Sequence, residues 1–168
     1  MSGAPAEPAA ADASPDPATV PVARSPWMPP RFFLVLGLAG LALHYALGGP
    51  VLLRLPWLGV ALAVAGFSVM AWGARTFAAA KTTIKPFEKS SVVVTAGPYG
   101  FTRNPMYLGM VAMLTGLALA LGTLGPWAAV VALAVLLQVR FIRNEERALT
   151  ASLGEQYERY RRSVRRWL

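Results

Sequence analysis

A run of 36 residues, 104–139, contains no charged side chain, and it constrains this chain more than any other feature. As a single α-helix the run would be about 54 Å long, whereas the hydrocarbon core of a bilayer is only about 30 Å thick. The sequence GTLGP at residues 122–126 offers a break, because glycine and proline interrupt helices. The run therefore predicts two membrane spans, about 105–122 and 126–142, joined by a tight turn.

Two earlier apolar segments predict further spans, at about 32–48 and 55–76. The composition supports this interpretation, since 55% of the residues are hydrophobic and 14% are charged, against about 25% charged residues in an ordinary soluble domain. The chain has no cysteine, which excludes disulfides and thiolate metal sites. We therefore expect an all-α fold, a polytopic membrane helical bundle of about four transmembrane helices.

The first 26 residues are rich in alanine and proline, and they predict a disordered tail because they cannot bury enough apolar surface to order themselves. The remaining residues, 27–168, form the predicted membrane domain. Its last part, 144–167, carries apolar residues at helical spacing and arginines on the opposite face. This pattern predicts a C-terminal amphipathic helix that lies at the membrane interface.

Basic residues are distributed unevenly over the predicted loops. Of the 16 lysines and arginines, 15 fall on one side of the membrane if the N-terminus is cytosolic, and only Arg54 falls on the other. The positive-inside rule then predicts that both termini and the loop 81–104 are cytosolic, in an integral protein of a bacterial inner membrane. The net charge of +8 indicates membrane lipids as partners rather than nucleic acid, for which the sequence contains no binding module.

Chemically useful groups gather at two predicted junctions on the cytosolic side. Before the third span, Arg103 precedes Asn104-Pro105, a helix start whose free N–H groups favour an anion. After the fourth span come Glu145 and Glu146. Because these two spans form a hairpin, we expect the junctions to be neighbours in space. Without further information, a capped helix beside a surface cluster of salt bridges explains these residues equally well.

The two junctions together carry a resemblance. The sequence GPYGFTRNPMYLG, and after it RNEERALTASLGEQYERYRRSVRRWL, resemble the isoprenylcysteine carboxyl methyltransferase and phospholipid methyltransferase family of integral membrane methyltransferases. The match runs over about 82–167, roughly half of the chain, and the two-part motif is specific. The first two spans are similar only in hydropathy. One departure is Asn104, where many members of the family have histidine.

The resemblance implies transfer of a methyl group from S-adenosylmethionine to a lipophilic or membrane-associated acceptor, through a carboxyl, amine or thiol group. It implies no metal. Arg143 and Glu146 are the implied catalytic residues, the first to hold an acceptor carboxylate and the second to deprotonate an amine or thiol. The implied cofactor-binding residues are Gly97, Pro98, Tyr99, Arg103, Asn104, Pro105, Tyr107, Gly109 and Glu145.

Two alternatives stay open at the level of sequence. The chain is also compatible with a non-catalytic membrane binding or assembly protein that retains the scaffold. His44, the only histidine, lies inside the first predicted span. An ionisable residue at membrane depth suggests a function, but a neutral histidine hydrogen-bonded within the bundle is an equally ordinary interpretation.

Overall fold

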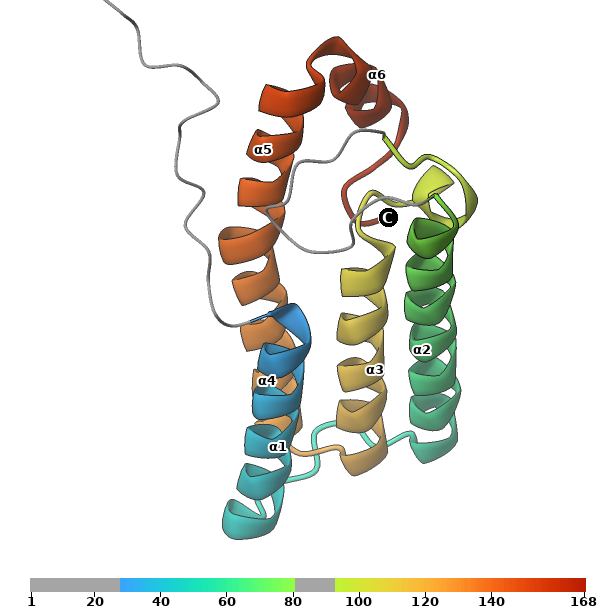
Figure 1. Ribbon diagram of the computed structural model, residues 1–168. Coiled ribbons are helices and arrows are strands. Elements are labelled where there is room, and N and C mark those ends of the chain that lie inside the picture. Colours follow the sequence, from blue (N-terminus) through green and yellow to red (C-terminus); the bar gives the residue numbers. More distant parts are fainter. Residues whose placement is uncertain (1–27, 81–92) are drawn as a thin grey trace, which may run out of the picture.

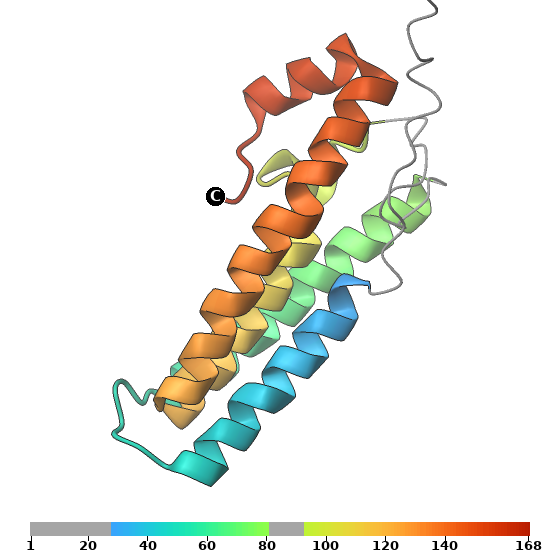
Figure 2. The ribbon, with the colours of Figure 1, turned by 90° about the vertical axis from the view of Figure 1, so that its left-hand side faces the viewer.

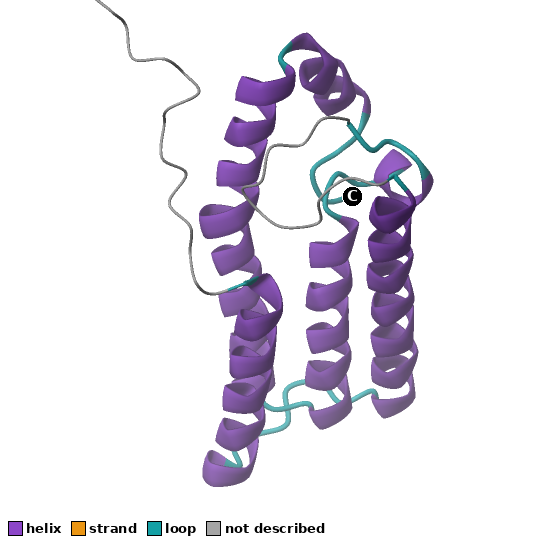
Figure 3. Ribbon diagram, viewed as in Figure 1, coloured by secondary structure: helices purple, strands orange, loops and turns teal. Residues whose placement is uncertain are grey.

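The computed structural model describes residues 28–80 and 93–168. The predicted tail and the first half of the predicted loop 81–104 lie outside these residues. In chain order the elements are α1 (Pro29–Leu47), α2 (Pro56–Ala79), the 3-10 turn η2 (Gly97–Gly100), α3 (Pro105–Leu121), α4 (Leu124–Leu136), the π-helical segment η3 (Leu137–Ile142), α5 (Arg143–Leu153) and α6 (Glu155–Ser163). Helices make up the regular structure of the described residues (Figure 3).

Four helices, α1 to α4, stand side by side and form the bundle, while α5 and α6 rise beyond one end of it (Figure 1). Three helices are long and apolar enough to cross a membrane: Pro29–Leu47, Pro56–Ala79 and Leu124–Leu153. The fourth, Pro105–Leu121, has 17 residues and is also apolar. At about 26 Å it lies at the short end of the range for a span. The predicted all-α membrane bundle is confirmed.

The predicted break between the last two spans is also confirmed. Gly122 ends α3 in the left-handed conformation, with φ of 80°, and its N–H donates to the carbonyl of Ala118. A side chain at this position would be strained, which is why glycine suits the turn. Helix α4 begins two residues later, at Leu124, so the two helices run antiparallel and bring residues 103–105 back beside the far end of α4.

Glycines allow α2 and α3 to approach closely. Gly59, Gly66 and Gly73 recur every seven residues, so they share one face of α2. A Cβ on Gly66 would lie 2.7 Å from the carbonyl oxygen of Gly109, and a Cβ on Gly109 would lie 2.5 Å from that of Gly66. Small residues serve membrane helices in this way because packing, rather than a hydrophobic driving force, holds the helices together.

The core joins α3 to the long helix opposite it. The buried cluster contains side chains from both: Tyr107, Met110, Leu114, Ala129, Leu133, Leu137, Phe141 and Ile142. The last three residues of this cluster lie in η3, and α4, η3 and α5 continue as one long helix that projects past the bundle (Figure 2). The bundle therefore supports α5 rigidly above the end of α3.

The C-terminal segment is helical, but it forms two helices, α5 and α6, where the sequence predicted one over 144–167. Gly154, with φ of 50°, separates α5 from α6, and α6 turns back toward the bundle (Figure 2). The tyrosines of the expected apolar face, Tyr157 and Tyr160, are 2% and 8% exposed, because that face packs on the protein. Helix α6 ends at Ser163, and the remaining residues, 164–168, run without helical structure beside the start of α3. We call residues 164–168 the C-terminal strap.

We predict that Gly66→Val lowers the thermal stability of the detergent-solubilised protein, because the added side chain would overlap the backbone of α3. Overpacking of this kind costs about 1–3 kcal/mol. Ala65→Val is the matched control, since Ala65 is its neighbour on α2 and is exposed. Gly66→Ala extends the test if the valine variant does not fold. Melting temperatures equal to that of the control for both Gly66 variants would contradict the packing described here.

Candidate active site

The two predicted junctions meet at a carboxylate held by two arginines. Arg103 Nη2 lies 3.0 Å from Glu146 Oε1. Arg166 approaches from the strap, with Nε donating to Oε1 at 2.9 Å and Nη2 donating to Oε2 at 2.6 Å. The side chains of Arg103 and Glu146 are only 8% and 12% exposed. The predicted proximity of the junctions is confirmed: Arg103 and Glu146 form a mostly buried ion pair, and Arg166, whose side chain is 39% exposed, completes an ion triad from the surface.

The strap is tied to the residues that lead into α3. The carbonyl of Arg165 accepts from the backbone N–H of Arg103 at 2.9 Å. The carbonyl of Arg166 accepts from Thr102 Oγ1 at 3.1 Å and from Asn104 Nδ2 at 2.9 Å. Asn104 does occupy the N-cap position of α3, as predicted, but its side chain makes no capping hydrogen bond. Its amide holds the strap instead.

A second carboxylate lies one residue earlier. Tyr107, in the first turn of α3, donates its hydroxyl to Glu145 Oε1 at 2.5 Å. A distance of this size is typical of the stronger hydrogen bonds between a hydroxyl and a charged oxygen. Among the described residues Glu145 Oε2 has no hydrogen-bond partner, so the carboxylate retains capacity to accept a bond.

Three buried tyrosines surround these carboxylates: Tyr99 from η2 and Tyr157 and Tyr160 from α6. Tyr160 donates its hydroxyl to the carbonyl oxygen of Tyr99 at 2.8 Å, which attaches α6 to η2. Burial first, and then the nearby Glu146 carboxylate, raise the pKa of Tyr157 to about 12. Burial likewise raises the pKa of Tyr99 and of Tyr160 above the usual value. All three phenols are therefore neutral donors at physiological pH.

Two buried polar atoms of this region have no partner within residues 28–80 and 93–168: the hydroxyl of Tyr99 and Nε of Arg103. Tyr99 is 4% exposed, and Glu145 is near enough to influence the titration of its hydroxyl. Buried polar groups are almost always hydrogen-bonded, so an unpartnered pair beside a free carboxylate oxygen needs an explanation. Each of these groups is able to bind a polar ligand, the Tyr99 hydroxyl and Arg103 Nε as donors and the Glu145 carboxylate as an acceptor.

Among the other residues implied by the resemblance, the two prolines shape the backbone. Pro98 and Pro105 are buried at the starts of η2 and α3. Gly97 has φ of 59° and lies against Trp72 and Thr76 of α2. Gly109 contacts Gly66, so helix packing accounts for it. Arg143 is exposed on α5 and does not join the ion triad.

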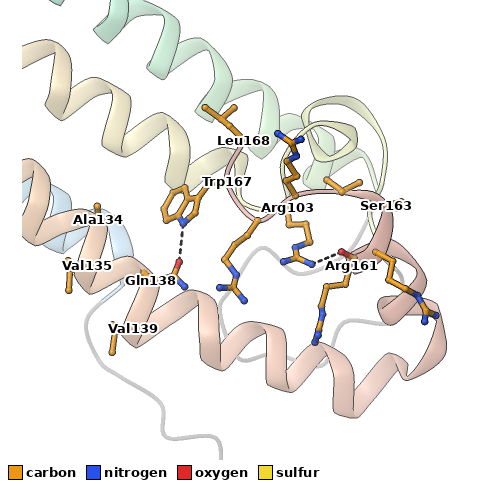
Figure 4. Close-up of a pocket in the computed structure, with 13 residues that line it drawn as sticks. Arg103, Ala134, Val135, Gln138, Val139, Arg161, Ser163, Trp167 and Leu168 are labelled. Atoms are coloured by element: carbon orange, nitrogen blue, oxygen red, sulfur yellow. Dashed lines mark hydrogen bonds between the residues drawn. The ribbon is translucent and has the colours of Figure 1, made fainter.

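The contributions of Thr102, Gln138, Arg166 and Trp167 to this site are not apparent from the sequence. The Trp167 indole donates to Gln138 Oε1 at 3.0 Å and fixes the end of the strap on η3 (Figure 4). From the sequence, the arginines near the C-terminus indicate membrane topology and the polar face of an amphipathic helix, but not a contact with Glu146. One available clue was Gly154, since a glycine after a helical stretch is a common helix end and allows the chain to turn back.

Comparison with known proteins gives two matches. The family model described as phospholipid methyltransferase matches residues 53–156, which include α2, α3, α4 and α5. An uncharacterized protein of Haemophilus influenzae is 35% identical over 63 residues, which are 38% of this chain and the whole of that protein. No solved structure matches this chain significantly.

We predict that Glu146→Gln releases the strap. The substitution keeps the shape of the side chain but removes the charge that binds Arg103 and Arg166, and a charged hydrogen bond contributes about 1.5–3 kcal/mol. Trypsin should then cleave after Arg165 and Arg166 roughly tenfold faster or more. Glu155→Gln is the control, because Glu155 is exposed on α6. Equal cleavage rates in the two variants would show that the triad does not hold the strap.

Proposed function

Because this chain belongs to the phospholipid methyltransferase family, and so is a membrane methyltransferase, we propose that it moves a methyl group from S-adenosylmethionine to a lipophilic or membrane-associated acceptor. The observation that carries the proposal is the buried constellation at the end of the α3–α4 hairpin. There, Glu145, Tyr99 and Arg103 offer a free carboxylate oxygen, an unpartnered hydroxyl and an unpartnered guanidinium N–H beside the ion triad.

The donor set fits S-adenosylmethionine, which carries a carboxylate, an ammonium group, a ribose diol and a sulfonium. Arg103 Nε and the free N–H groups in the first turn of α3 would hold the carboxylate, since a helix N-terminus favours an anion. Glu145 would accept from the ammonium group or the ribose diol, and the hydroxyl of Tyr99 would supply a further hydrogen bond. When bound, the cofactor supplies a methyl group that is attached to positively charged sulfur. After the transfer, the rest of the cofactor is a neutral thioether.

The residues around this site contribute mainly by positioning. The Tyr107 hydroxyl fixes the orientation of Glu145, and the ion triad fixes Arg103. Holding two reactants in line removes much of the entropic barrier of a displacement, so methyl transfer needs little more from the protein. The packed tyrosines of α6 exclude water from the same region.

The nature of the acceptor group determines whether a base is needed. A carboxylate acceptor is already a nucleophile, whereas an amine or thiol first loses a proton. Both oxygens of Glu146 accept hydrogen bonds from arginine side chains. Glu146 could therefore accept a proton only if one of these hydrogen bonds were broken. We therefore assign Glu146 to positioning and leave proton acceptance to Glu145 or solvent. Arg143, exposed on α5, lies outside this constellation but would be accessible to an acceptor carboxylate at the membrane surface.

We also propose that the site faces the cytosol, where S-adenosylmethionine is made, in a bacterial inner membrane with both termini cytosolic. The α1–α2 connection, which contains Arg54, lies at the end of the bundle opposite the site, whereas α5, α6 and the strap, with their arginines, lie at the same end as the site (Figure 1). A reporter enzyme that is active only in the cytosol should be active when it is fused after Leu168. Activity of a reporter that works only outside the cytosol, fused at the same position, would reject the orientation and separate the site from its cofactor.

We predict that the full chain binds S-adenosylmethionine in detergent, as measured by isothermal titration calorimetry, and that Glu145→Gln weakens binding by about 1–3 kcal/mol. Tyr99→Phe should also weaken binding without lowering the melting temperature, because the hydroxyl that it removes has no partner among the described residues. Tyr45→Phe, at a side chain that is 76% exposed, is the control. Absence of binding by the parent chain, or parental affinity in both site variants, would overturn the proposal.

A further inference from the structure

A groove with a volume of about 910 Å³ runs between the strap and the long helix α4–η3 (Figure 4). The end of α6 and the strap form one wall, and Ala134, Val135 and Val139 form part of the other. It is separate from the buried tyrosine and Glu145 region, but it borders the ion triad, since Arg103 and Arg166 line it as well. Of the proposed cofactor-binding residues, Arg103 alone is among the residues that line it.

The upper part of the groove is strongly basic. Five arginines line it and no aspartate or glutamate does: Arg103, Arg161, Arg162, Arg165 and Arg166. Glu146 compensates Arg103 and Arg166, and Glu158 pairs with Arg161 at 3.2 Å. Arg162 and Arg165 are exposed and form no ion pair within the described part of the chain. These two guanidinium groups leave a local excess of positive charge that favours an anion with several acceptor oxygens.

The lower part of the groove is apolar and continues along α4. The side chains of Val135 and Val139 are 57% and 52% exposed. They also line a second hollow of about 730 Å³ on the same helix, which reaches Val131. The apolar strip therefore extends from the arginines for more than two helical turns toward the middle of the bundle, along a helix that is apolar enough to span the membrane.

An aromatic side chain marks the transition between the two parts. Trp167 lies in the groove wall, with its indole N–H held by Gln138 at 3.0 Å (Figure 4). Tryptophan is enriched where hydrocarbon meets headgroups, because its ring is apolar and its N–H is polar. Along the groove, the arginines come first, then Trp167, then the valines. A phospholipid in one leaflet has the same order of charged headgroup, interface and acyl chain.

We propose that this groove binds one anionic phospholipid of the bilayer. Its phosphate contacts Arg162 and Arg165, and one acyl chain lies along Val139, Val135 and Val131. A zwitterionic lipid would place its own cation among the arginines, and a soluble phosphate would leave the apolar strip uncovered. The bound lipid covers the outer side of the strap and so supports Arg166 in its contact with Glu146. The inference depends on the groove alone and not on the proposed methyl transfer.

The test is titration of the full chain, in neutral detergent micelles, with phosphatidylglycerol that carries a fluorophore on an acyl chain. We expect Arg162→Gln combined with Arg165→Gln to weaken binding roughly tenfold, since each basic residue near a membrane surface adds appreciably to the attraction for anionic lipid. The control pair is Arg147→Gln with Arg159→Gln, which removes the same charge from exposed positions outside the groove.

The apolar part is tested separately. Val135→Trp should fill the strip and weaken lipid binding, whereas Val64→Trp, at a valine of α2 that is 61% exposed, should not. Phosphatidylcholine should compete poorly, and inorganic phosphate should compete only at far higher concentration than phosphatidylglycerol. Parental affinity in both groove variants would overturn the proposal. Equal competition by phosphatidylcholine would reject an anionic lipid, and equal competition by inorganic phosphate would reject a role for the strip.

Discussion

The structure at the functional end depends on Glu146, which lies between Arg103 and Arg166. Removing two opposite charges from water is expensive, and such groups are stable only when every partner is present. Here three segments must be in place at once: the residues before α3, the first turn of α5 and the strap. The ion triad therefore links these three segments, and the hydrogen bonds of Thr102 and Asn104 hold the strap at the same place.

The bundle makes this arrangement possible. The glycine contacts fix α2 against α3, and the turn at Gly122 returns the chain so that α4 passes beside α3. Because α4, η3 and α5 form one continuous helix, the position of Glu145 and Glu146 follows from packing in the membrane domain. Helix α6 then closes over the carboxylates with Tyr157 and Tyr160. Packing in the bundle thus determines the geometry of the polar end.

Much of this could be predicted from the sequence, because it depends on local or one-dimensional patterns. The charge-free run and its glycine-proline break predict the hairpin, and the hairpin predicts that residue 103 and residues 145–146 are neighbours. The path of the last residues could not be predicted in this way. The apolar residues at helical spacing in 144–167 could pack on lipid or on protein. Only the tertiary structure shows that the chain turns at Gly154 and that the tyrosines of α6 contact η2. The role of Asn104 also depends on a strap 62 residues away.

A double-mutant cycle on Arg103 and Glu146 tests the central claim most directly. Arg103→Ala, Glu146→Ala and the double variant would be compared with the parent by thermal unfolding in detergent. Arg103→Ala leaves Glu146 with Arg166 alone, and Glu146→Ala leaves both arginines without their carboxylate. If Arg103 and Glu146 are coupled, the loss of stability in the double variant should be smaller than the sum of the single losses by about 0.5–3 kcal/mol. Additive losses would contradict an account in which this ion pair holds the site together.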